Sequence, residues 1–174
     1  MSRVDCRKPS TGGQALIEFA LVLPLLLVLV VNVVNFGSFF FAWITMANAA
    51  RAGAQYMCLG FSSVGSLRSP NDAEVANVVA ADIYTLENRS SLAVRVCRKK
   101  SGVAAVCATP TGSGTFTDPA ADTRLESPFF VMGWVDVQYT YRPIFSGFSL
   151  PGLGIYATLP PLTLHRQSVM RLIQ

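Results

Sequence analysis

The chain has 174 residues, enough for one modest globular domain and a membrane anchor but too few for a second independent core. Hydrophobic residues make up 51% and charged residues only 14%, well below the roughly 25% that is usual in soluble domains. Part of the chain is therefore expected to lie outside water. The net charge of +4 is too small and too dispersed to indicate a nucleic-acid-binding protein.

Residues 1–13 are polar and basic and end in two glycines, a composition that cannot bury a core. We predict that they form a processing segment and not part of the fold. The basic residues in this segment are opposed by a single acidic residue, Asp5. Such an excess ahead of an apolar run predicts a cytoplasmic N-terminus, with everything after Ala50 on the far side of a membrane.

Residues 14–60 are predicted to form one long stem helix. No charged residue and no histidine occurs between Phe19 and Ala50. A helix over this stretch rises about 48 Å, which exceeds the roughly 30 Å hydrocarbon core of a bilayer. We therefore expect the helix to span the membrane and to project beyond it, as far as about Tyr56.

Three residues interrupt the apolar character of this stem. Pro24 is predicted to kink the helix, which a membrane tolerates where neighbouring groups satisfy the freed carbonyl. Asn32 and Asn35 have two interpretations that the sequence leaves open. They either hydrogen-bond to adjacent helices or are tolerated polar residues without a role.

Residues 61–174 are predicted to form a head domain, which begins with a linker rich in Ser, Gly and Pro. A helix is expected to start with Ser69 as its N-cap and Pro70 at its first position, and to end at about Glu87. Its apolar face consists of residues at helical spacing, namely Val75, Val79, Ile83 and Leu86.

Strands are predicted to follow this helix. Alternation around residues 92–97 indicates one strand, and residues 103–108 are expected to return as its partner, before a long loop over 109–122. The clearest strand spans 135–142, and a last strand is expected at 162–169 after a loop over 143–161.

In the clearest strand every second side chain is apolar, which predicts an antiparallel sheet with one face in water. The expected apolar face consists of Val135, Val137, Tyr139 and Tyr141, and the expected wet face of Asp136, Gln138, Thr140 and Arg142. The fold class is therefore α+β, with a long N-terminal transmembrane stem helix followed by a small domain that has a second helix and an antiparallel sheet.

The four cysteines are distributed unevenly over this topology. Cys6 falls on the reducing side of the membrane, and the other three fall on the side where disulfides persist. Cys97 and Cys107 flank Ser101-Gly102, a spacing that allows a disulfide-pinned hairpin, although connectivity does not follow from sequence alone. Cys58 is then either a free thiol or paired elsewhere. Neither spacing is typical of a metal site, so no metal is predicted.

The most informative stretch is GQALIEFALVLP, from Gly13 to Pro24. A basic leader, a glycine and a single glutamate, Glu18, five residues later resemble the cleavage signature of class III signal peptides in type IVb and tight-adherence pilins. ALIEFALVLP is similar to the TadE/TadF group of pilin-like proteins, in which phenylalanine commonly follows the glutamate, as Phe19 does here. The resemblance covers residues 13–56, including ANAARAGAQY, and continues more weakly in VDVQYTYRP and LTLHRQSVMR.

This resemblance implies a minor pilin (pseudopilin) of the tight-adherence pilus, matured by a prepilin peptidase that cuts between Gly13 and Gln14. It implies that Glu18, followed by Phe19, engages the N-terminal amine of a neighbouring subunit. The implied partners are the peptidase, other minor pilins, the major pilin, the inner-membrane assembly platform and the membrane, with no nucleic acid. The protein would lie in the bacterial inner membrane with its head in the periplasm, and it would be no enzyme and need no cofactor.

Elementary chemistry supports the same interpretation of this spacing. Cleavage after Gly13 creates a cationic α-amine at Gln14, one helical turn from Glu18. A carboxylate in an apolar helix costs several kcal/mol near mid-bilayer and less near the interface, so it needs a partner. A residue without a side chain lets the backbone lie close to a protease, which favours Gly13. Cleavage after Gly12 fits less well, because the glutamate would then be the sixth residue.

Three other interpretations of the stem remain. Glu18 would snorkel to the interface of an ordinary signal anchor if the chain were an uncleaved single-pass envelope protein with a periplasmic binding domain. A secretory signal peptide cleaved at Ala47-Asn48-Ala49 would need an apolar region far longer than the usual 7 to 15 residues. A membrane-tethered periplasmic enzyme would need a catalytic constellation.

The residues that would serve such an enzyme are few. His165 is the single histidine and is placed on the last strand with no acid or cysteine nearby, so we interpret it as a satisfied or exposed strand residue. The basic run Arg98-Lys99-Lys100 is interpreted as the charged tip of a hairpin.

Overall fold

The computed structural model describes residues 12–59, 70–100, 103–117, 131–145 and 158–172, so most of the predicted leader, residues 1–11, lies outside the described residues. The described residues form two α-helices, two short 3₁₀ helices and four strands. The helices are α1 (Gly12–Leu59), α2 (Asp72–Asp82), η1 (Ile83–Thr85) and η2 (Arg89–Ser91). The strands are β1 (Ala93–Lys100), β2 (Val106–Thr111), β3 (Val131–Tyr141) and β4 (Leu162–Leu172).

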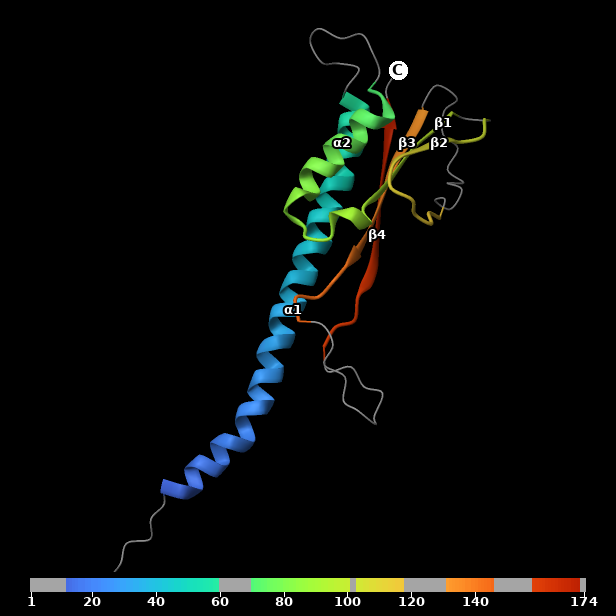
Figure 1. The fold of residues 1–174 in the computed structure, drawn as a ribbon. Coiled ribbons are helices and arrows are strands. Elements are labelled where there is room, and N and C mark those ends of the chain that lie inside the picture. The colour runs from blue at the N-terminus through green and yellow to red at the C-terminus, as the bar shows by residue number, and fades with distance from the viewer. Residues whose placement is uncertain (1–11, 60–69, 101–102, 118–130, 146–157, 173–174) are drawn as a thin grey trace, which may run out of the picture.

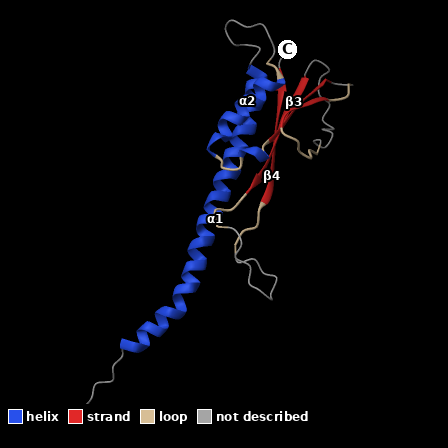
Figure 2. Ribbon diagram, in the orientation of Figure 1, coloured by secondary structure: helices blue, strands red, loops and turns tan. Residues whose placement is uncertain are grey.

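The four strands form one antiparallel sheet in the order β2-β1-β3-β4, and both α-helices lie on one of its faces (Figure 2). The α+β fold class and the long N-terminal apolar helix are therefore confirmed. The second helix and the antiparallel sheet are present as predicted.

Helix α1 has two parts that differ in their surroundings. It continues through Pro24, and its N-terminal part stands clear of the rest of the molecule (Figure 1). Every side chain from residue 13 to residue 30 is exposed. The first fully buried side chain is that of Asn35, and the later buried positions belong to the hydrophobic core of the head, namely Ala42, Met46, Ala49, Ala50, Ala54 and Met57. One helix thus provides both the stem and a core element of the head.

Small residues on α1 allow α2 to pack closely against it. A Cβ atom added at Gly53 would lie 2.6 Å from Cγ2 of Val79, so only glycine fits at this crossing. The predicted apolar face of the second helix is buried as expected, and its residues Val75, Val79, Ile83 and Leu86 are all less than 7% exposed.

The start of α2 differs from the prediction. The N-cap is Asn71, and its backbone N–H donates a hydrogen bond to Glu74 Oε2 at 2.9 Å. Glu74 stands three residues after Asn71, which is the spacing of a capping box. Asp72, which stands three residues after Ser69, is instead bound by Arg98 of β1. Ser69 itself lies outside the described residues. The prediction for Arg98 is therefore wrong as well, because its guanidinium is bonded to α2 and is not at a free hairpin tip.

The strands are displaced from their predicted limits. β2 begins at Val106 and reaches Thr111, so it includes three residues that were expected to belong to the loop. A turn follows at Gly112, whose φ of 66° favours glycine. β3 begins earlier and β4 ends later than predicted, because Val131 is paired with β1 on one side and with β4 on the other.

The two faces of the sheet are both covered near the middle of β3. The predicted apolar face of Val135, Val137, Tyr139 and Tyr141 is buried against the helices. The other face was expected to be wet, and this is wrong at Asp136, whose exposed fraction is 0%. The ring of Phe116, from the segment after β2, lies beside Arg95 and His165 on this face and excludes water from it.

Candidate processing and assembly site

The four residues predicted to direct processing and assembly lie in the first two turns of α1. Gln14, Glu18 and Phe19 are all exposed, and Phe19 retains 59% of its accessible surface. Nε2 of Gln14 donates a hydrogen bond to Oε1 of Glu18 at 3.2 Å, as expected for side chains four residues apart on a helix. In the uncleaved chain the carboxylate of Glu18 therefore has a hydrogen-bond partner, the side-chain amide of Gln14.

Gly13 has no packing role in the folded chain. A Cβ atom added at this position would meet no atom within 4 Å. A glycine inside a helix lowers helix stability by about 1 kcal/mol relative to alanine. The described fold therefore does not require glycine at this position.

Glu18 is isolated in a long apolar segment. It is the only charged residue between residues 9 and 50 of the sequence. The helix from Gly13 to Cys58 is long and apolar enough to cross a membrane. A single carboxylate at the end of such a segment marks a position where a cationic partner would stabilise the helix.

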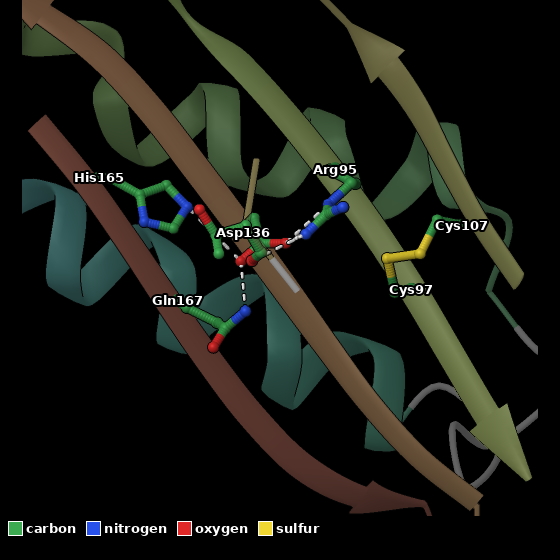
Figure 3. Close-up of polar contacts among 7 residues, drawn as sticks. Arg95, Cys97, Cys107, Asp136, His165 and Gln167 are labelled. Carbon is green, nitrogen blue, oxygen red and sulfur yellow. Dashed lines mark hydrogen bonds and ion pairs between the residues drawn. A yellow bond between two sulfur atoms is a disulfide. The ribbon is translucent and has the colours of Figure 1, made fainter. Parts of the chain in front are cut away.

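The strands β1 and β2, which carry the two cysteines of the predicted hairpin, lie at the other end of the molecule from the start of α1 (Figure 1). Cys97 on β1 and Cys107 on β2 are directly opposite each other in the ladder and are joined by a disulfide (Figure 3). Cys58 is a free thiol, and its Sγ lies 3.5 Å from the carbonyl oxygen of Arg171. The disulfide thus fixes the edge strand β2, which makes few contacts with the core.

A polar cluster that the sequence did not indicate is centred on Asp136 (Figure 3). Oδ2 accepts from Arg95 Nε at 2.8 Å, Oδ1 accepts from Gln167 Nε2 at 2.7 Å, and His165 Nε2 lies 3.7 Å from Oδ1. Arg95 and Gln167 are the direct cross-strand neighbours of Asp136 on β1 and β4. The cluster therefore connects the three longest strands through one buried carboxylate.

This arrangement corrects the interpretation of His165, which does have an acid nearby. Its ring remains 39% exposed, and Phe116 packs beside it. A buried carboxylate needs several donors, and Arg95 and Gln167 provide them. Among the described residues no group of three His, Cys, Asp or Glu side chains is placed to hold a metal ion. We therefore assign the cluster to the stability of the sheet.

A small pocket of about 190 Å³ lies beside α1, where the free part of the stem joins the head. Phe41 of α1 and Ile144, which follows β3, line its walls together with Arg142. Burial raises the pKa of Tyr139, which also lines the pocket, while a hydrogen bond from the backbone N–H of Asn88 acts in the opposite direction. The pocket is too small for a cofactor of ordinary size.

Comparison with known proteins yields one match. Residues 13–55 match the sequence model of a family described as TadE-like protein. The matched range contains Gly13, Gln14, Glu18 and Phe19 and ends within the buried part of α1. No curated protein and no solved structure matches the chain.

Proposed function

We propose that this chain is a minor pilin of the tight-adherence pilus, matured by prepilin peptidase between Gly13 and Gln14, and the match of residues 13–55 to the TadE-like family supports this. In this role it contributes to the assembly, initiation or anchoring of the pilus. The chemistry is performed on the protein at the Gly13–Gln14 bond, and the chain itself is not an enzyme.

The position of Glu18 is the observation that carries this proposal. Its carboxylate lies one turn from the bond to be cut, on an exposed helical segment with no other charged residue before Arg51, and it accepts a hydrogen bond from the neutral amide of Gln14. Cleavage would place a cationic amine at Gln14 itself. An ammonium group pairs with a carboxylate more strongly than an amide does where water is scarce.

The bare part of α1 supports a role in helix packing. Its exposed apolar side chains from residue 13 to residue 30 have no partner among the described residues of the head. In the proposed role they pack first in the inner membrane and then against the stems of other minor pilins and of the major pilin. The head would lie in the periplasm and select its neighbours, and the inner-membrane assembly platform would be a further partner.

The fold argues against a secretory signal peptide cut at Ala47-Asn48-Ala49. Cleavage there would remove Ala42 and Met46, which are 2% and 0% exposed in the core of the head. Loss of two buried side chains and their helix would expose the facing surfaces of α2 and the sheet. A cut at Gly13 leaves every buried residue of α1 in place.

The test is mass spectrometry of the N-terminus of the protein purified from membranes of cells that carry the pilus system. The proposal expects a chain that begins at Gln14. Gly13→Leu should block cleavage without disturbing the fold, because the side chain would enter open space. Gly12→Leu is the matched control and should still be cut after Gly13.

An intact N-terminus in the wild-type protein would refute the proposal and leave the alternative, an uncleaved single-pass envelope protein. If Gly12→Leu blocked cleavage and Gly13→Leu did not, the cut would lie after Gly12. Glu18 would then be one residue farther from the new amine than the proposal requires.

A further inference from the structure

The end of the head that lies nearest the free part of α1 is hydrogen-bonded to this helix by the side chain of Asn35. Nδ2 of Asn35 donates to the carbonyl oxygen of Phe145 at 2.9 Å, and Oδ1 accepts from the backbone N–H of Phe145 at 3.1 Å. The hydroxyls of Ser38 and Tyr141 both donate to the carbonyl oxygen of Asn35 at 2.9 Å. Asn35 is 0% exposed.

This set of bonds, the Asn35 latch, pairs both backbone polar groups of a residue that belongs to neither a helix nor a strand. Such pairing is what irregular backbone needs where water is absent, because each unpaired group in hydrocarbon costs several kcal/mol. In water the same backbone groups would find partners without Asn35. The latch therefore fits a position at or below the surface of a bilayer.

The length of the stem places the Asn35 latch at the same depth in the bilayer. If Glu18 marks one edge of the hydrocarbon core, about 20 further helical residues cross its roughly 30 Å and end near Ser38. Asn35 precedes this limit, and Phe145 is bonded to Asn35. The end of the head therefore lies level with the far edge of the hydrocarbon core, on whichever side of the membrane the head is placed.

Apolar side chains gather at this level of the head. We call them the rim, and each is between 49% and 58% exposed; they are Phe40, Phe41, Ile44, Ile144 and Phe145. Phe41 and Ile144 meet in the pocket beside the stem. The exposed Arg142 stands next to them, and arginine at this height reaches lipid phosphates. The rim continues the uncharged surface of the membrane-spanning part of α1.

We infer that the head rests in the bilayer through this rim, with Ile144 and Phe145 inserted among the lipid chains near the headgroups and Arg142 at the phosphates. The head is then held against the membrane at two places, the stem and the rim. This contact goes beyond the proposed role in the pilus and does not depend on cleavage at Gly13.

The test uses the full-length protein in vesicles of phosphatidylethanolamine and phosphatidylglycerol with brominated acyl chains, which quench tryptophan fluorescence at short range. Ile144→Trp places a reporter on the rim. Tyr84→Trp places the matched control on η1, where Tyr84 is 67% exposed. The parent protein with Trp43 and Trp134 supplies the background. Groups in this layer lie about 5–10 Å deep, so residue 144 should be quenched at least about twofold more than residue 84.

Equal quenching at the two positions would overturn the inference. The inference would also be overturned if residue 144 were shielded from brominated lipid and cross-linked to a second copy of the chain, because a protein partner would then cover the rim. Quenching at residue 144 that stays the same when the lipid-to-protein ratio is raised with lipid of the same bromine content supports contact with lipid.

A second variant tests the latch itself. Asn35→Leu added to Ile144→Trp leaves the backbone groups of Phe145 without their partner, so they should move toward water and quenching at residue 144 should fall to the level of residue 84. Asn48→Leu is the control, because it makes the same change at an exposed position of α1. Quenching unchanged by Asn35→Leu would overturn the role of the latch.

Discussion

Arg95 and Asp136 lie directly opposite each other on β1 and β3, and the guanidinium of Arg95 bonds Oδ2 of Asp136 at 2.8 Å. The side chain of Asp136 is 0% exposed and that of Arg95 is 13% exposed. The pair sits on the face of the sheet that does not contact the helices. It joins β1 to β3, and the bond from Gln167 to the same carboxylate adds β4.

Asp136→Asn is expected to destabilise the head by about 3–5 kcal/mol, because it removes the buried carboxylate that accepts hydrogen bonds from both Arg95 and Gln167. The measurement is denaturant unfolding of the full chain in detergent, followed by the near-ultraviolet circular dichroism of the buried Trp134. Asp82→Asn, at an exposed position of α2, is the control and should change stability by less than about 0.5 kcal/mol. Equal unfolding midpoints for the two variants would contradict the assignment of the cluster to stability.

Gly53→Leu is expected to destabilise the packing of α1 on α2 by about 1–3 kcal/mol or more, because its Cβ would lie 2.6 Å from Cγ2 of Val79. Gly37→Leu makes the same change in the same helix at a position where a Cβ meets no atom within 4 Å. This control should unfold at the wild-type denaturant concentration or slightly above it, since leucine favours helix. A loss of stability of similar size in both variants would mean that the crossing of the two helices is not as close as 2.6 Å implies.

The sequence predicted the main elements of this fold because each has a local signal. The uncharged run of the stem, the helical spacing of Val75 and Val79, and the alternation in β3 all reflect burial on one face of one element. The limits of the strands were less accurate because they depend on pairing. Val131 belongs to β3 since it has partners on two other strands, and that information is distributed over distant parts of the chain.

The features that the sequence did not predict are those in which distant residues satisfy one another. Asn35 had two open interpretations, and its partner proved to be the backbone of Phe145, 110 residues away. Asp136 was expected on a wet face because a single strand cannot show what covers it. The spacing of Ala42, Met46, Ala49 and Gly53 is one signal that was available. The recurrence of these small and apolar residues at intervals of three and four describes a buried stripe.

Reduction of the Cys97–Cys107 disulfide is expected to lower the free energy of unfolding of the head by about 2–4 kcal/mol, because the bridge fixes the edge strand β2 to β1. The measurement compares unfolding of the wild-type chain with and without reductant. The double variant Cys97→Ala, Cys107→Ala should behave like the reduced protein and should not respond to reductant. Cys58→Ser is the control and should retain the full response, since Cys58 is a free thiol. A wild-type protein that is indifferent to reductant would contradict a stabilising role for the bridge.

Glu18→Gln is expected to be cut after Gly13 and yet to fail in assembly, because it keeps the size of the side chain and its ability to bond Gln14 but loses the charge that pairs with an amine. Incorporation should fall at least about tenfold, which corresponds to about 1.4 kcal/mol of pairing energy. Two measurements on the same cells check this: the N-terminal mass of the membrane-bound chain, and the amount that co-purifies with sheared pili. Gln14→Ala is the control, since it removes the hydrogen bond of 3.2 Å but keeps the α-amine, and it should be incorporated normally. Normal incorporation of Glu18→Gln would show that the carboxylate acts without its charge, and failure of Gln14→Ala would show that the amide of Gln14 matters for assembly.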